Sequence, residues 1–83
     1  MAKKQTPLDA LIRAIEVAGS QKELADRISS VDLPIGQSGI SNWIQRLKRV
    51  PAERVLAVEQ AVDGKVSRYE LRPDIYPREE RAA

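Results

Sequence analysis

The chain has 83 residues, a formal net charge of +2 and neither cysteine nor histidine. This size predicts one small domain with a thin core, and the missing residue types exclude disulfide scaffolds, Cys/His zinc sites, thiol nucleophiles and histidine bases. No apolar run approaches the roughly 18 residues of a membrane span and the first residues lack the pattern of a signal peptide, so we expect a soluble, cytoplasmic protein.

The chain is predicted to begin with a flexible arm that is followed by a helix. Residues 1–6 have little to bury and are expected to form a flexible arm, which could also touch phosphates. A first helix is predicted from Pro7 to Ala18 or Gly19, because Thr6 offers a capping hydroxyl and proline suits the first helical position. The apolar face expected for this helix consists of Leu8, Leu11, Ile12, Ile15 and Ala18.

A second helix is predicted to begin at once. Ser20 is followed three residues later by Glu23, which is the spacing of a capping box. The helix should stop near Ser29 or Ser30. Its expected inner face consists of Leu24, Ala25 and Ile28.

Residues 29–35, with the sequence SSVDLPI, are predicted to form a connection because Pro34 removes a backbone donor. Three apolar residues alternate in this connection, at Val31, Leu33 and Ile35. We expect at least one of them to pack into the core, and a short helical turn within the connection is possible.

A central helix is predicted from Gly36 to Arg49. Its apolar stripe consists of Ile40, Trp43, Ile44 and Leu47, at the spacing i, i+3, i+4, i+7. Trp43 is therefore expected in the core and not as a platform on which bases stack. Gly39 inside this helix costs about 1 kcal/mol relative to alanine. It either permits close approach to a sugar–phosphate backbone or another helix, or is simply tolerated.

The remainder should be helical and then irregular. Pro51 is expected to begin a fourth helix that runs to about Val62 and ends at Asp63–Gly64. Residues 67–70 repeat the capping-box pattern as SRYE, which predicts a short last helix, with a strand at 65–68 as the alternative. Residues 72–77 are expected to be irregular but packed, and residues 78–83 to form a flexible tail.

Positive charge gathers at the end of the central helix. Between Trp43 and Arg54 there are four cations and only one acidic residue, Glu53. This cluster favours a nucleic-acid partner, although a run of charges on a helix is also typical of a solvated face. Without histidine, cysteine or a glycine-rich phosphate loop, the chain is predicted not to be an enzyme and to need no cofactor or metal.

The second and central helices form the pair that a helix-turn-helix needs. The segments that carry a resemblance are QKELADRI, GQSGISNWIQRLKRVPAERVLAVEQA and GKVSRYELRPDIYP. They resemble small phage Cro-type repressors and YdaS-like prophage regulators over residues 8–77. The resemblance implies an all-α, compact bundle of four to five short helices, similar to the lambda repressor, with a DNA-binding domain at residues 7–77. One departure is an elbow between helices 2 and 3 that is longer by about five residues.

The resemblance also implies which side chains read DNA. The base-reading positions fall on Gln37, Ser38, Ser41, Asn42 and Gln45. Amide side chains can bond bidentately to adenine, and Arg46 could contact guanine in the same way. The alternative for Gln37 and Ser38 is a role only in capping the helix.

Phosphate contacts are expected from a second group of side chains. Gln21 resembles the glutamine that clamps a phosphate at the start of helix 2 in this family. Further candidates are Lys22, Lys48, Arg49 and Arg54. The alternative is that Lys48 and Arg49 are simply solvated.

These inferences predict a sequence-specific repressor of a phage or prophage that binds double-stranded DNA at a palindromic operator. A chain this small makes few base contacts, so a homodimer is expected at least on DNA, without a membrane or small-molecule partner. The alternative is an antitoxin-type module whose main partner is a toxin, with DNA binding secondary.

Overall fold

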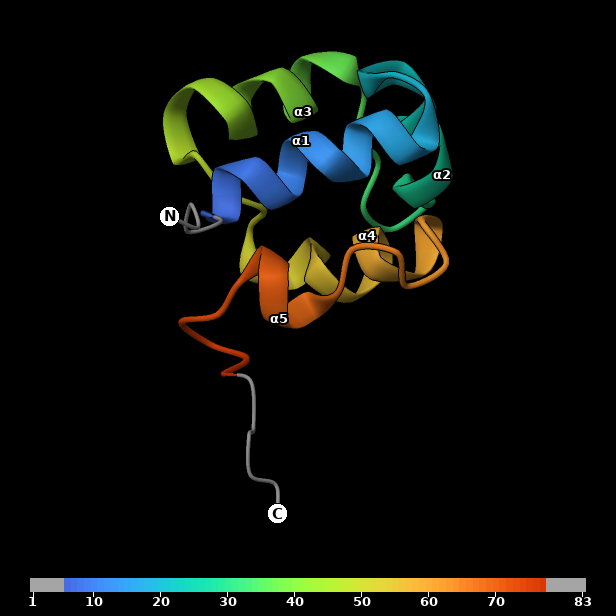
Figure 1. Cartoon of the computed structure of the whole chain (residues 1–83). Coiled ribbons are helices and arrows are strands. Elements are labelled where there is room, and N and C mark those ends of the chain that lie inside the picture. The colour runs from blue at the N-terminus through green and yellow to red at the C-terminus, as the bar shows by residue number, and fades with distance from the viewer. Residues whose placement is uncertain (1–5, 78–83) are drawn as a thin grey trace.

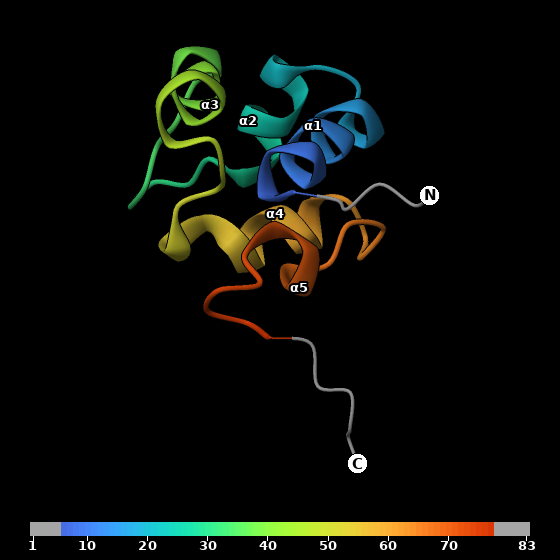
Figure 2. The same cartoon turned by 60° about the vertical axis from the view of Figure 1, so that its left-hand side comes forward.

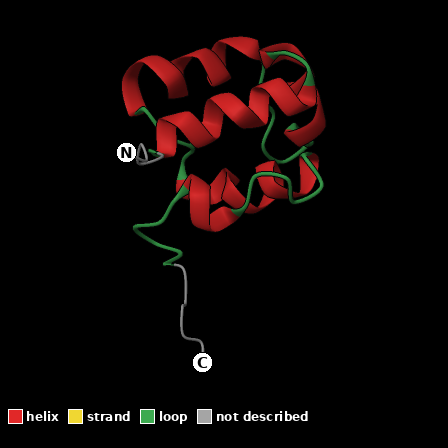
Figure 3. Cartoon of the chain, in the orientation of Figure 1, coloured by secondary structure: helices red, strands yellow, loops and turns green. Residues whose placement is uncertain are grey.

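The computed structural model describes residues 6–77, and every regular element among them is helical (Figures 1 and 3). The all-α prediction is confirmed, and the alternative strand at 65–68 is wrong. The predicted tail at 78–83 lies outside the described residues, as does the predicted arm apart from Thr6. The elements are α1 (Pro7–Ala18), α2 (Gln21–Ile28), α3 (Gln37–Asn42), the π-helical η1 (Trp43–Leu47), the 3₁₀ turn η2 (Ala52–Arg54), α4 (Val55–Ala61) and α5 (Arg68–Leu71).

The helices stack around α1. Figure 1 shows α1 across the middle of the bundle, with α3 on one side and α4 and α5 on the other. At one end α2 packs against α1, α3 and α4. None of the helices among residues 6–77 is long and apolar enough to cross a membrane. The buried apolar residues are Ala10, Leu11, Ala14, Ala18, Leu24, Ala25, Ile28, Ile40, Trp43, Val50, Val55, Val58, Val62, Val66 and Leu71.

The caps of α1 agree with the sequence, but its buried face is rotated from the prediction. Thr6 caps the helix, and Gly19 ends it with φ of 119°. Ala10 and Ala14 are fully buried, whereas Ile12 is 39% exposed. Because α1 is flanked by helices on two sides, small residues lie where the helix axes approach most closely, and the larger Ile12 lies at the edge.

The predicted fourth helix begins later than expected. Pro51 is extended, with φ of −60° and ψ of 149°, and the 3₁₀ turn η2 precedes α4. A 3₁₀ turn is a common beginning of an α-helix. The regular helix therefore covers Val55–Ala61 only.

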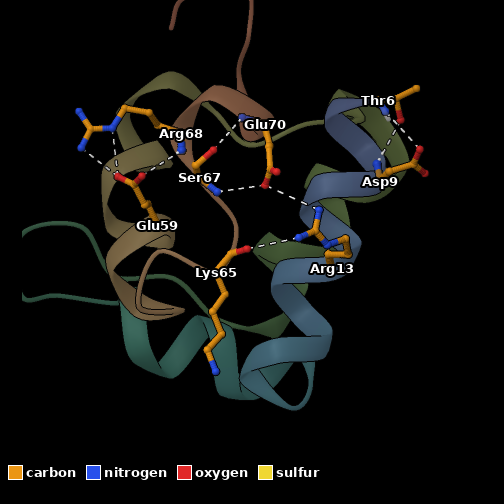
Figure 4. A network of polar contacts seen from close by, with 8 residues as sticks. All are labelled: Thr6, Asp9, Arg13, Glu59, Lys65, Ser67, Arg68 and Glu70. Carbon is orange, nitrogen blue, oxygen red and sulfur yellow. Dashed lines mark hydrogen bonds and ion pairs between the residues drawn. The ribbon is translucent and has the colours of Figure 1, made fainter. Parts of the chain in front are cut away.

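The capping box predicted for the last helix is present and is tied to α1. Ser67 and Glu70 exchange hydrogen bonds between side chain and backbone at 3.2 and 3.3 Å. Arg13 of α1 donates from Nη2 to the Lys65 carbonyl at 3.3 Å and lies 3.6 Å from the Glu70 carboxylate (Figure 4). These contacts hold α5 against the side of α1 remote from α3.

Candidate nucleic-acid interface

The α2–α3 pair has the arrangement of a helix-turn-helix, with the second helix at the edge of the bundle. In Figure 2, α3 lies at the periphery with α2 between it and α1, and α4 and α5 lie below these three helices. Ser20 begins α2 by accepting a hydrogen bond from the Glu23 N–H at 3.1 Å. The inner face of α2 is the predicted one, since Leu24, Ala25 and Ile28 are buried. The outer side of α3 is therefore free of other elements among residues 6–77.

The central helix has the predicted two faces. Ile40 is fully buried and Trp43 is 5% exposed, so Trp43 belongs to the core and is no stacking platform. Ser41 is half-buried and accepts a hydrogen bond of 3.4 Å from the Gln45 amide. The exposed polar residues of this helix are Gln37, Ser38, Asn42, Gln45 and Arg46. Five of the six predicted base-reading side chains are therefore exposed, and the sixth, Ser41, is half-buried.

The first turn of α3 does not use its polar side chains as caps. Gly36 is the N-cap residue, and no side chain caps the helix. Among residues 6–77, the side chains of Gln37 and Ser38 have no hydrogen-bond partner. The alternative in which these two residues only cap the helix is therefore wrong, and their polar groups are available to a ligand.

The helix ends earlier than predicted. From Trp43 the backbone continues as a π-helical turn, and Lys48 closes it in the left-handed region with φ of 60°. The Lys48 N–H donates to the Trp43 carbonyl, five residues back, at 2.6 Å. The wider turn changes the phase of the apolar stripe, so Leu47, predicted in the core, is 44% exposed. Arg49 lies beyond the helix.

Gly39 is explained by the elbow. A β-carbon at this position would lie 2.7 Å from Ile35 Cγ1 and 2.9 Å from Cδ1. These distances are too short, so any side chain would displace Ile35, which packs against the core as predicted for one apolar residue of the elbow. Val31 is 98% exposed, and the elbow contains no helical turn.

The side chains predicted to contact phosphates differ in exposure and in their partners. Gln21, at the first position of α2, is half-buried, and Lys22 is exposed and pairs with Asp26 at 3.2 Å. An exposed pair at this spacing contributes only roughly 0.3–0.5 kcal/mol, so a phosphate can displace Asp26. Lys48 is exposed without a partner among residues 6–77. Arg49 lies 3.9 Å from the Asp74 carboxylate.

The structure contradicts the prediction that Arg54 contacts a phosphate. It is 9% exposed, and its guanidinium donates to the main-chain carbonyls of Ile28 and Pro34. The sequence held a signal for this burial, because Arg54, Val58 and Val62 follow one another at the i, i+4 spacing of the apolar stripe. We therefore remove Arg54 from the candidate interface.

The comparisons with known proteins agree with this geometry. The family model described as "Bacterial toxin YdaS" matches residues 11–80. The chain belongs to the YdaS family. An Escherichia coli (strain K12) member, named "Putative transcriptional regulator YdaS", is 40% identical over 63 residues, which are 76% of this chain and 59% of that protein. The chain thus spans about three fifths of the length of this curated relative.

A solved structure shares the fold. It is a "Cro protein from putative prophage element Xfaso 1" of Xylella fastidiosa strain Ann-1, and it matches with a TM-score of 0.72 and 40% identity over 83% of this chain and 97% of that one. The predicted resemblance to Cro and YdaS-like proteins is confirmed. The part of the chain matched by the YdaS family model includes all of α2, the elbow and the central helix.

Asp74 lies beside the candidate interface of this YdaS-family chain, and the sequence did not indicate a role for it. Arg72 donates to its carboxylate at 2.7 and 2.9 Å, and also donates to the Val50 carbonyl at 3.0 Å. The hydrogen bond from Arg72 is the main cause that lowers the pKa of Asp74 from 3.8 to about 2. Residues 72–77 are irregular but packed, as predicted, and these hydrogen bonds fasten them to the segment that follows the central helix.

An Asp74→Asn variant is expected to unfold at a lower temperature than the wild type at pH 7. Because the folded-state pKa lies below the unfolded one, the charged carboxylate stabilises the fold above about pH 3.8 and loses this effect as the pH falls through about 2. The difference in unfolding temperature should therefore shrink between pH 4 and pH 2. A carbon-13 NMR titration that placed the Asp74 midpoint near 3.8 would contradict this account.

Proposed function

We propose that this chain is a sequence-specific repressor of phage or prophage type that reads the major groove of double-stranded DNA with α3 and η1. The observation that carries the proposal is a row of exposed polar side chains on a helix whose other face is locked into the core by Ile40 and Trp43. The names of the relatives, a transcriptional regulator and a Cro protein, support the same function.

The side chains on the outer face match the chemistry of base edges. Asn42 and Gln45 can each make bidentate hydrogen bonds to adenine, and Arg46 can do so to guanine. The hydroxyl groups of Ser38 and Ser41 donate or accept, so they suit several bases. Gln37, at the first position of α3, completes the reading surface at the end of the helix that would enter the groove first.

Cations and amides at the margins of this surface would fix the register on the phosphate backbone. Gln21 and Lys22 lie in the first turn of α2, which crosses the backbone in helix-turn-helix complexes. Lys48 and Arg49 follow the other end of the reading helix. Asp74 competes with a phosphate for Arg49, so DNA binding would exchange one acidic partner for another.

Repression would follow from occupation of an operator that overlaps a promoter, which excludes RNA polymerase. One copy of the chain presents few base contacts, so we propose a homodimer on a palindromic operator with half-sites about one helical turn, or roughly 34 Å, apart. The segment after Gly64 is our first choice for the surface that pairs the two copies, since Tyr69 and Ile75 there are 40% and 43% exposed.

The salt dependence of DNA binding separates this function from its alternative, an antitoxin-type module that captures a toxin. Electrophoretic retardation of the DNA that flanks the gene should weaken steeply between 50 and 200 mM salt, by about two orders of magnitude if four phosphates are neutralised. If no retardation appeared at low salt while one protein co-purified in stoichiometric amount, the repressor proposal would be abandoned in favour of the antitoxin-type module.

A further inference from the structure

Arg54 is a buried cation without a carboxylate partner among residues 6–77. Its Nη1 donates to the Ile28 carbonyl and its Nη2 to the Pro34 carbonyl, each at 3.4 Å. Ile28 is the last residue of α2, so the guanidinium lies at the negative end of that helix, where a cation is stabilised. The charge is thus balanced by main-chain oxygens, and the proposed DNA contacts leave it without a role.

The two carbonyl groups stand at opposite ends of the elbow between α2 and α3. Within the elbow, Ser29 Oγ accepts a hydrogen bond from the Ile35 N–H at 3.0 Å, and the Ile35 side chain lies against Gly39. A guanidinium presents its donors in a rigid planar fork, so one Arg54 side chain sets the spacing of the two carbonyl groups that it joins. Arg54 and Ser29 together close the base of the elbow.

The tip of the elbow lies beyond this closure. Ser30 and Leu33 bond to each other twice, through the Leu33 N–H to Ser30 Oγ at 3.0 Å and the Ser30 N–H to the Leu33 carbonyl at 3.3 Å. Val31 is 98% exposed. In Figure 2 the connection projects from the side of the bundle between α3 and the beginning of α4. The tip is therefore held by its own hydrogen bonds. The hydrogen bonds of Arg54 and Ser29 bring the two ends of the elbow together, although the elbow itself is long.

We propose that Arg54 is a positioning residue for sequence reading, which sets where Gln37 and Ser38 enter the major groove. This role rests on the proposed function. Pro34, which Arg54 holds, precedes Gln37 by only three residues, so a displaced Pro34 moves the first turn of α3. The position of Asn42 should not change with such a shift, because Asn42 lies between Ile40 and Trp43, whose side chains are buried in the core.

The test compares base preferences of Arg54→Met and Arg54→Lys with those of the wild type, by selection from randomised double-stranded DNA. The base pairs read by Gln37 and Asn42 are first assigned with alanine variants of each. In Arg54→Met, discrimination at the base pair read by Gln37 should fall about tenfold, while that at the base pair read by Asn42 is retained. Arg54→Lys should retain more of this discrimination than Arg54→Met does, because an ammonium can still donate to one or both carbonyls.

The matched control is Val31→Asp at the tip, which should leave every base preference unchanged. Hydrogen exchange of the Ile35 amide reports on the closure without DNA and should accelerate in Arg54→Met but not in the control. If Arg54→Met does not fold, Ser29→Ala opens the same base, and it should produce the same selective loss.

Three results would overturn the proposal. They are unchanged base preference in a folded Arg54→Met or Ser29→Ala chain, a uniform weakening at all base pairs, and a loss of preference in Val31→Asp equal to that in Arg54→Met. A wild type without any base preference would instead overturn the proposed function, and this role with it.

Discussion

Replacing Ile40 with alanine is expected to remove a large part of the stability of the fold, and DNA binding should be lost at temperatures where the wild type is folded and the variant is not. Ile40 is fully buried where α3 meets the core, and truncation of such a side chain costs about 2–5 kcal/mol. Small domains have only about 5–15 kcal/mol of stability in total. Chemical denaturation followed by circular dichroism measures the loss directly.

The matched control for this variant is Leu47→Ala. Leu47 was predicted on the same apolar stripe, but it is 44% exposed, so its truncation should cost less than about 1 kcal/mol. Equal losses from the two variants would show that the helix continues regularly past Trp43 and buries both residues. The π-helical turn and the resulting orientation of the reading surface would then be wrong.

Most of the helices could be predicted because their signals are local. Thr6, Ser20 and Ser67 each offer a hydroxyl to an N–H group three residues later, and all three form this bond in the structure. Such caps depend on only a few neighbouring residues. The two-sided character of the central helix was visible for the same reason, since its polar and apolar positions repeat with the helical period.

Two of the errors have a different origin, in contacts between segments far apart in sequence, and a third comes from a local backbone bond. Arg54 is a cation at the edge of a positive cluster in the sequence, but the fold places it beneath the elbow, where carbonyl groups 20 and 26 residues away receive its hydrogen bonds. Ala10 and Ala14 are buried because helices lie on two sides of α1, which the periodicity of one helix does not show. The phase shift at Trp43 is local, because it follows from the backbone bond between the Lys48 N–H and the Trp43 carbonyl, which no propensity predicts.

Replacing Asn42 with alanine is expected to remove one element of base recognition and to leave the fold intact. Asn42 is exposed, at the last position of α3, and its side chain has no partner among residues 6–77. Loss of a bidentate contact to a base costs about 1–3 kcal/mol of discrimination at that base pair. General affinity for DNA should change much less, because it comes mainly from phosphate contacts.

The matched control is Gln60→Ala, which removes an exposed amide from α4, on the other side of α1. Both variants should unfold within about 0.5 kcal/mol of the wild type.

The most direct test of sequence reading by α3 is the ratio of affinities for the selected operator and for an unrelated duplex, measured at one salt concentration for the wild type, Asn42→Ala and Gln60→Ala. We predict a high ratio for the wild type and Gln60→Ala, and a ratio at least about fivefold lower for Asn42→Ala. An unchanged ratio for Asn42→Ala would contradict the assignment of this face to the major groove.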